Sequence, residues 1–81
     1  MAAPSTLQKF EMGTLGNSYL TRYYCAGTGT EITTAPNAIQ SHWIGMTPGG
    51  TAVTATSVAA TGVITLSTNP TNGVNLYVLR K

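Results

Sequence analysis

Three short runs near the carboxyl end of the chain alternate apolar and polar residues, and this alternation constrains the fold more than any other feature. The runs cover Thr51–Val58, Val63–Ser67 and Val74–Leu79, and residues typical of turns separate them. Because successive side chains along a β-strand point to opposite faces, a period of two indicates strands with one buried face. The pattern therefore predicts an antiparallel meander of three strands joined by two short turns.

Three further strands are expected upstream. The aromatic-rich run Ser18–Ala26 and the shorter runs Thr30–Thr34 and Ser41–Met46 are bounded by glycine and proline, which favour turns. Residues 1–17 fit neither the helical nor the strand period, and two glycines disfavour a helix there, so we predict an extended N-terminal arm. The expected fold is all-β: a small antiparallel sandwich or barrel of about six short strands, with residues 18–81 as a single β-domain.

The core of such a domain must be thin, because a chain of 81 residues buries only about 60–65% of the surface that its unfolded form exposes. The residues expected on the buried faces are Leu20, Tyr24, Ile32, Ile44, Met46, Val53, Ile64, Leu66, Leu76 and Val78. The single cysteine, Cys25, cannot form a disulfide within the chain, and the histidine, cysteine and glutamate residues lack the spacing of a metal site. We therefore expect no metal and no cofactor, and association as the remaining source of stability.

Only six of the 81 residues are charged, whereas about a quarter is usual in soluble domains. Four Lys or Arg against two Glu give a net charge of +2 without a basic patch, which disfavours nucleic acid as a partner. The first residues lack the basic start and apolar run of a signal peptide, and no later run is long enough to span a membrane. The sequence thus predicts a protein made in the cytoplasm, with a neutral surface suited to contact with other protein.

Cys25 and His42 are the one pair with the chemistry of a nucleophile and its base. The chain has no aspartate and only two glutamates, so a third group that would orient the histidine is scarce. Cysteine is also commonly a small buried apolar residue. We therefore expect a packed thiol, a structural histidine, no catalytic residue and no enzymatic activity.

Tyr19, Tyr23, Tyr24 and Trp43, together with Arg22, have the chemistry of a platform on which a flat ligand stacks. A single-stranded nucleic acid also needs a line of basic residues, which the chain lacks, whereas a sugar needs no charge. Packing accounts for most of these side chains. A small carbohydrate-binding module nevertheless stays open as an alternative function.

Six apolar or aromatic residues are candidates for partner binding. Four lie in the predicted arm, which offers them no cover, and two lie on the last strand, on the face opposite its expected core residues. The six are Leu7, Phe10, Met12, Leu15, Tyr77 and Leu79. For the last strand two explanations stay open: either the second face is buried in the middle of a sandwich, or it docks on a partner.

The chain as a whole resembles small virion proteins of tailed bacteriophages, in particular head decoration or cement proteins. The resemblance lies in the arm Met1–Asn17, low-charge strands such as Thr51–Val58, the turn Thr47–Gly50 and the ending Asn75–Lys81. It implies a non-enzymatic structural protein of the virion, made in the host cytoplasm, that stabilises the head by bridging capsid subunits. The implied partners are further copies of the chain, with a trimer favoured, and the major capsid protein or another virion protein. A tail, baseplate or fibre-attachment component is the alternative within the same class.

Overall fold

The computed structural model describes residues 3–45 and 53–81, which form β-strands and contain no helix. The strands are β1 (Thr6–Leu15), β2 (Ser18–Ala26), β3 (Glu31–Thr33), β4 (Ile39–Ile44), β5 (Ala55–Val58), β6 (Val63–Leu66) and β7 (Val74–Arg80). The predicted all-β class is confirmed, with seven strands in the described residues where about six were expected. The additional strand is β1, which lies in the segment expected to be an arm.

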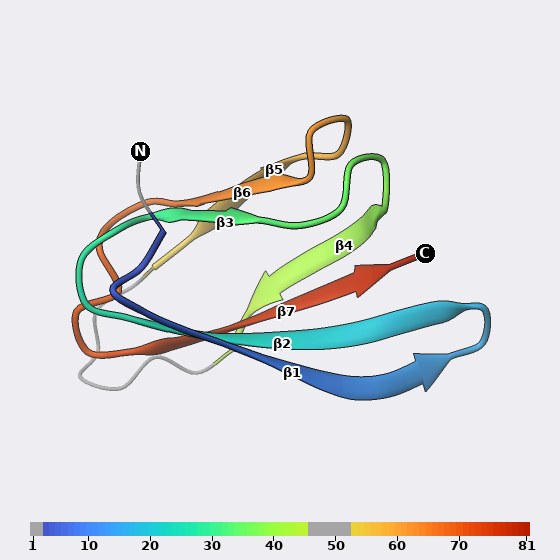
Figure 1. Cartoon of the computed structure of the whole chain (residues 1–81), viewed down its shortest axis with the longest axis horizontal. Helices are drawn as coiled ribbons and strands as arrows, with labels where there is room; N and C mark the ends of the chain where they lie inside the picture. Colours follow the sequence, from blue (N-terminus) through green and yellow to red (C-terminus); the bar gives the residue numbers. More distant parts are fainter. Residues whose placement is uncertain (1–2, 46–52) are drawn as a thin grey trace.

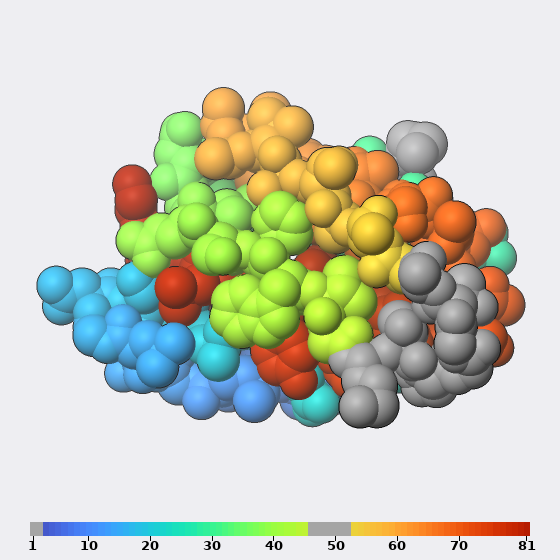
Figure 2. All heavy atoms as spheres, turned by 180° about the vertical axis from the view of Figure 1, so that it is seen from behind, coloured from blue at the N-terminus to red at the C-terminus, as the bar shows by residue number. Residues whose placement is uncertain are grey.

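The strands form two antiparallel sheets that pack face to face (Figure 1). The larger sheet has the order β1-β2-β7-β4 and the smaller one the order β3-β6-β5. β4 and β5 meet at one side of the molecule, where His42 Nε2 lies 3.1 Å from the carbonyl oxygen of Ala55. Figure 2 shows these two strands side by side from behind. The architecture is a sandwich and not a closed barrel.

The larger sheet extends beyond the smaller one on the side of β1. From the shared side of β4 and β5, the smaller sheet continues over the larger one through β6 and β3, which leaves β1 without a described strand opposite it (Figure 1). All ten residues of β1 are exposed. β1 is therefore open to solvent on both faces and along its outer edge.

The core lies between the two sheets. The apolar residues buried there, among those that the structure describes, are Tyr23, Cys25, Ile32, Val53, Ile64, Leu66, Val74, Leu76 and Val78. Six of the ten residues predicted for the core are in this set, and Ile44 packs against it while partly exposed. Met46 lies outside the described residues. The prediction is wrong for Leu20 and Tyr24, which lie half-buried on the outer face of β2.

The face that β2 turns inward is the opposite of the predicted one. Tyr23 and Cys25 are buried in the core, and Cys25 is fully inaccessible to solvent. Both faces of this strand carry apolar and aromatic side chains, so alternation alone does not select the buried one. The deciding residue is Arg22, which shares its face with Leu20 and Tyr24 and whose charge disfavours burial in the core.

The predicted meander is correct for its first two strands and wrong for the third. β5 and β6 form a hairpin, but β7 crosses to the larger sheet and pairs with β2 and β4. The crossing passes through Pro70, which is buried and whose carbonyl oxygen accepts hydrogen bonds from Gly27 N at 3.1 Å and Gly73 N at 2.9 Å. Alternation identifies the strands but not their partners, because the path of the connecting turn decides which strands meet.

The predicted N-terminal arm is also corrected. Its residues are extended, but they belong to the sheet, because β1 pairs antiparallel with β2 along its whole length. Gly16 and Asn17 form the two-residue turn between the strands, and Gly-Asn is a typical hairpin signal. A bulge between Glu11 and Gly13 shifts the register, and even before it Leu7 and Phe10 lie on opposite faces, so no apolar alternation indicates this strand.

Candidate binding surface

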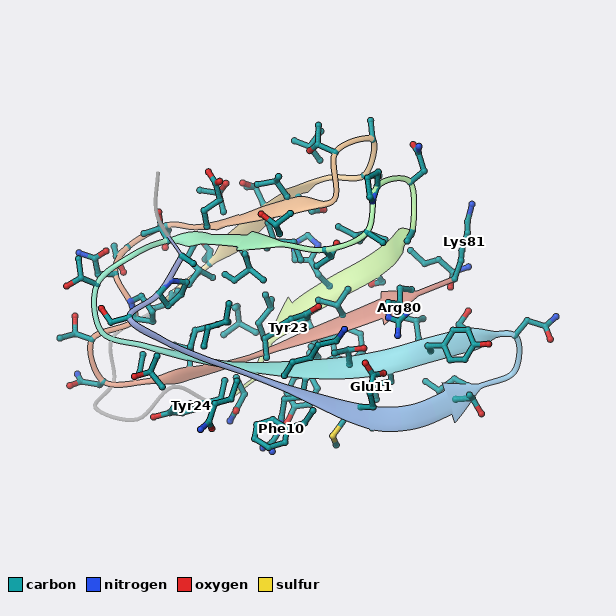
Figure 3. The ribbon with its side chains drawn as sticks, in the orientation of Figure 1. Phe10, Glu11, Tyr23, Tyr24, Arg80 and Lys81 are labelled. Atoms are coloured by element: carbon teal, nitrogen blue, oxygen red, sulfur yellow. The ribbon has the colours of Figure 1, made fainter. Side chains whose placement is uncertain are left out.

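The outer face of the larger sheet is not covered by the smaller one. One line of residues crosses all four strands on this face, since the register places Phe10 opposite Arg22, Arg22 opposite Tyr77 and Tyr77 opposite Trp43. We call these four residues the aromatic row. In Figure 3, Phe10 points away from the smaller sheet, whereas the core residue Tyr23 points toward it.

Close contacts join the members of the aromatic row in two pairs. The guanidinium carbon of Arg22 lies 4.5 Å from the centre of the Phe10 ring, within the range of a cation–π interaction. The rings of Trp43 and Tyr77 stack with their centroids 5.6 Å apart and their planes 8° from parallel. The row is therefore a preformed surface of three aromatic rings and one positive charge.

Gly45, directly after β4, makes room for one of these rings. A Cβ atom on residue 45 would lie 2.8 Å from Cε2 of Tyr77, which is closer than side-chain atoms approach. The backbone N–H of Gly45 donates a hydrogen bond to the carbonyl oxygen of Asn75 at 2.8 Å, so the chain continues along the sheet edge here. The glycine thus lets the Tyr77 ring lie against the backbone at the end of β4.

Two polar atoms of residues on this face have no hydrogen-bond partner among the described residues. They are Nε of Arg22 and Oδ1 of Asn75, and both atoms are buried. Arg22 also forms no ion pair within the described part of the chain. An unpaired buried polar atom is unfavourable. Among the described residues, Arg22 Nε is thus an unsatisfied donor and Asn75 Oδ1 an unsatisfied acceptor on this face.

The structure brings four of the six predicted partner-binding residues to the outer face. According to the register they are Phe10, Leu15, Tyr77 and Leu79. Met12 lies within the bulge of β1 and is half exposed. Leu7 lies opposite Cys25, on the inner side of β1, where 39% of its surface is exposed. The binding of a partner by these residues stays a prediction.

The aromatic residues proposed as a stacking platform are divided between the two faces. Tyr23 is in the core, and Tyr19 lies on the same side of β2, whereas Tyr24 and Trp43 lie on the outer face with Arg22. Arg22 and Trp43 are not among the residues predicted from the sequence to bind a partner. The alternation within each strand groups residues of that strand, but the register that aligns β2, β7 and β4 is visible only in the structure.

A polar cluster lies on the inner side of β1, where the smaller sheet does not reach. Nη2 of Arg80 lies 3.2 Å from Oε2 of Glu11, and Nζ of Lys9 lies 3.4 Å from Oε1 of the same carboxylate. Figure 3 shows Glu11 and Arg80 pointing toward one another. Desolvation acts to raise the pKa of the Glu11 carboxyl, but the charges and hydrogen bonds of Arg80 and Lys9 outweigh it, so this pKa lies below its usual 4.5.

A hollow of about 380 Å³ opens beside this cluster, between β1 and the segment at the end of β3. Its lining comes from Leu7, Lys9, Tyr23, Arg80 and residues 33–35. The two cations in this lining share the single carboxylate of Glu11, so the polar cluster keeps a net charge of +1. The hollow thus has a mildly positive lining in which both cations already contact Glu11.

Cys25 and His42 do not come together. They lie on β2 and β4, on opposite sides of β7, where Cys25 is opposite Val74 and His42 is opposite Val78. Desolvation raises the pKa of the buried Cys25 thiol to about 11, so the reactive thiolate is scarce at neutral pH. These two residues therefore do not assemble a nucleophile and its base.

Comparisons with known proteins found no match: no family model fits the chain, and no curated protein or solved structure is significantly similar to it. Residues 3–45 and 53–81 contain no group of three or more His, Cys, Asp or Glu side chains arranged to hold a metal ion. In the same residues, no helix has the length and hydrophobicity needed to cross a bilayer. The contacts within the aromatic row make the outer face the candidate functional site.

Proposed function

We propose that the chain is a non-enzymatic structural protein of a virion, which binds another virion protein through the aromatic row. The observation that carries this proposal is the unbroken line of Phe10, Arg22, Tyr77 and Trp43 across the uncovered sheet face. Aromatic residues and arginine are enriched at the centres of protein interfaces, where they contribute most of the binding energy. The row thus has the composition of an interface centre.

The low charge of the chain supports contact with protein in particular. Of its six charged residues, Glu11 lies between Lys9 and Arg80 in the polar cluster, and only Arg22 belongs to the row. The residues Phe10 and Trp43 are 38% and 43% exposed, and burying apolar surface contributes roughly 25 cal/mol per Å². A neutral partner surface covers these rings without desolvating many charges.

The proposed role is that of a capsid decoration or cement protein. Several copies of the chain bind the major capsid protein, bridge neighbouring subunits and stabilise the head. A component of the tail, the baseplate or a fibre attachment would use the same face on a different virion protein. The identity of the partner therefore distinguishes these roles within one structural class.

Co-sedimentation with assembled capsids tests this proposal, and the genes beside this one identify the capsid protein to use. Trp43→Ala and Tyr77→Ala each remove a ring from the row, and we expect each to weaken capsid binding about ten-fold or more. Val58→Ala is the matched control, because Val58 is a 56% exposed apolar residue on the smaller sheet, and it should bind like the unmodified chain.

Three results decide between the roles. Capsid binding that depends on the row supports the decoration role. Binding to a tail or baseplate protein alone moves the assignment to that part of the virion. Failure to bind any virion protein, or equal binding by Trp43→Ala, Tyr77→Ala and Val58→Ala, contradicts the proposal.

A carbohydrate-binding module is the second candidate function, and the stacked pair of Trp43 and Tyr77 favours it. Sugar rings pack on exposed aromatic faces, and an amide beside the rings offers hydrogen bonds to hydroxyl groups. Asn75 lies two residues before Tyr77, on the same face of β7. Glycan-array binding by a monomeric chain, lost in Trp43→Ala and kept in Val58→Ala, would support this function, whereas an array without any bound glycan would reject it.

A further inference from the structure

β1 is an edge strand of the larger sheet, and its outer side has no partner strand among the described residues. Of the described strands, only β2 pairs with it, so the backbone N–H and C=O groups along its other edge have no strand partner in the sheet. The strand is ten residues long, every residue in it is exposed, and it carries the apolar side chains of Leu7, Phe10 and Met12. A long exposed edge of this kind is a template for pairing with another strand.

Natural proteins commonly protect such an edge with a charged residue or a bulge. β1 has both, but neither blocks its central part. Lys9 forms an ion pair with Glu11 on the same strand, 3.4 Å away, so its ammonium group has an anionic partner there. The bulge follows Glu11 and therefore leaves the residues before it in regular strand geometry.

The charges on β1 are self-complementary. Lys9 and Glu11 stand on either side of Phe10 in sequence and project from the opposite face of the strand. If a second copy of β1 pairs antiparallel about a two-fold axis at Phe10, then residue 9 of each copy lies opposite residue 11 of the other. Both cross-strand pairs then join Lys9 with Glu11, and opposite charges in such pairs are stabilising.

Pairing about this axis also brings together similar groups of the two copies on each face of the sheet. On the inner side, Glu11 comes to lie between Arg80 of its own chain and Lys9 of the second copy. On the outer side, the Phe10 rings of the two copies meet, so the two aromatic rows join end to end. An axis one residue away, at residue 9 or at residue 11, would instead place the two Lys9 or the two Glu11 opposite each other, and it would lose this match.

We propose that two copies of the chain pair through β1, antiparallel and about a two-fold axis at Phe10, to form one continuous sheet of eight strands. The regularly paired segment is residues 9–11 of each copy, since the bulge that contains Met12 ends the regular strand there. This inference rests on the self-association in the proposed function and names its interface. A contact of this type uses the same surface on both copies and closes at two, so it predicts a dimer in place of the expected trimer.

Charge reversal tests the proposed register directly. Lys9→Glu places two glutamates opposite each other across the axis, and Glu11→Lys places two lysines there, so each variant alone should dissociate. An equimolar mixture of the two variants restores both opposite-charge pairs, so it should form a mixed dimer. The double variant Lys9→Glu/Glu11→Lys should pair with itself and not with the unmodified chain.

Sedimentation velocity over a concentration series measures these effects on the purified chain. The unmodified chain should show twice the 8.4 kDa mass of one copy. Each single reversal should raise the dissociation constant about ten-fold or more. Lys81→Glu and Glu31→Lys make the same changes in charge outside β1 and should leave the dimer intact.

Circular dichroism shows which variants are folded, and if Glu11→Lys does not fold, Lys9→Glu and its control Lys81→Glu carry the test. A monomeric unmodified chain, a mass of three copies, or dimers unaffected by Lys9→Glu would overturn the inference. So would variants that dissociate but do not recombine in the mixture. These measurements use the chain alone. A negative result therefore contradicts pairing through β1 but does not test binding to the capsid, which the co-sedimentation experiment measures.

Discussion

Nη2 of Arg80 lies 3.2 Å from Oε2 of Glu11, although 69 residues separate the two in the sequence. The contact joins β7 to the edge strand β1 across β2. Thr21, a fully buried residue of β2, completes it: its Oγ1 donates to Oε2 of Glu11 at 3.3 Å and accepts a hydrogen bond from Nε of Arg80, also at 3.3 Å. Three strands are thus fastened together on the side where β1 has no opposing strand.

Removing the charge of Glu11 should loosen β1 first. We expect Glu11→Gln to lower the hydrogen-exchange protection of amides in β1, with little change in β6, because opening of an edge strand is a local event. In the unmodified chain, lowering the pH should cause the same loss of hydrogen-exchange protection in β1. The pKa of Glu11 is lowered in the fold, so its contribution is present above pH 4.5 and disappears as the pH falls through the lowered value.

Glu31→Gln is the control for this experiment, because it removes the same charge from β3. Protection factors for β1 that are equal in Glu11→Gln and in the unmodified chain would show that the contact with Arg80 does not hold the edge strand.

Truncating the core should destabilise the domain much more than truncating its surface. Leu66 and Leu76 are buried between the sheets, so Leu66→Ala and Leu76→Ala should each lower the free energy of unfolding by roughly 2–5 kcal/mol. Val58→Ala removes apolar atoms from a residue that is 56% exposed and should cost less than about 0.5 kcal/mol. Denaturant unfolding measures all three, and similar losses throughout would contradict the assignment of the faces.

Alternation in the sequence predicts the fold well where only one face of a strand is apolar enough to be buried. Ile64 and Leu66 share one face of β6, and Leu76 and Val78 share one face of β7, and all four are in the core as predicted. In β2 both faces are apolar, and there the choice between them fails. In β1 neither face is buried, and Leu7 and Phe10 lie on opposite faces even before the bulge, so no fixed apolar period marks the strand.

The candidate site is predicted less completely than the fold. Tyr77 and Phe10 are recognisable as residues without cover, because their strands offer apolar side chains that the thin core cannot take in. Arg22 and Trp43 join them only because β2 and β4 pair with β7 in one register, and register depends on contacts between distant segments. A surface assembled across four strands is therefore not readable from any one of them.

Cys25 should react slowly with alkylating reagents in the folded protein. It is inaccessible to solvent and its pKa is raised to about 11, so both access and thiolate are lacking at neutral pH. We expect iodoacetamide to modify the thiol rapidly only after denaturant is added. Mass spectrometry follows the reaction over time. Rapid alkylation of the folded chain would show that the core opens at this position.

The same thiol should make the fold sensitive to alkaline pH. Between pH 9.0, the ordinary pKa of the thiol, and about pH 11, the unfolded chain loses the proton that the folded chain keeps. The free energy of unfolding therefore falls as the pH rises through this range, by up to about 2–3 kcal/mol at 1.36 kcal/mol per pKa unit. Cys25→Ala should show a smaller fall in denaturant unfolding, and an equal fall would assign the effect to other groups.

Gly62, in the turn between β5 and β6, should tolerate substitution less than Gly16 at the tip of the first hairpin. Both have positive φ, 75° and 62°, so alanine is strained at either position. At Gly62, however, a Cβ atom would lie 2.5 Å from the carbonyl oxygen of Thr34, whereas nothing lies within 4 Å at Gly16. Gly62→Ala should therefore cost roughly 1–3 kcal/mol more in denaturant unfolding than Gly16→Ala, and equal costs would refute the close packing there.

Trp43 is the only tryptophan of the chain, and its fluorescence should separate the two proposed interfaces. It lies on β4, at the opposite edge of the larger sheet from β1, and is 43% exposed. Dissociation of a β1-paired dimer on dilution should therefore leave its emission maximum unchanged. Binding of the aromatic row to a capsid surface removes water from the indole ring and should shift the emission to shorter wavelength. Val58→Ala should show the same shift as the unmodified chain, whereas a shift on dilution alone would place Trp43 in the contact between copies and count against pairing through β1.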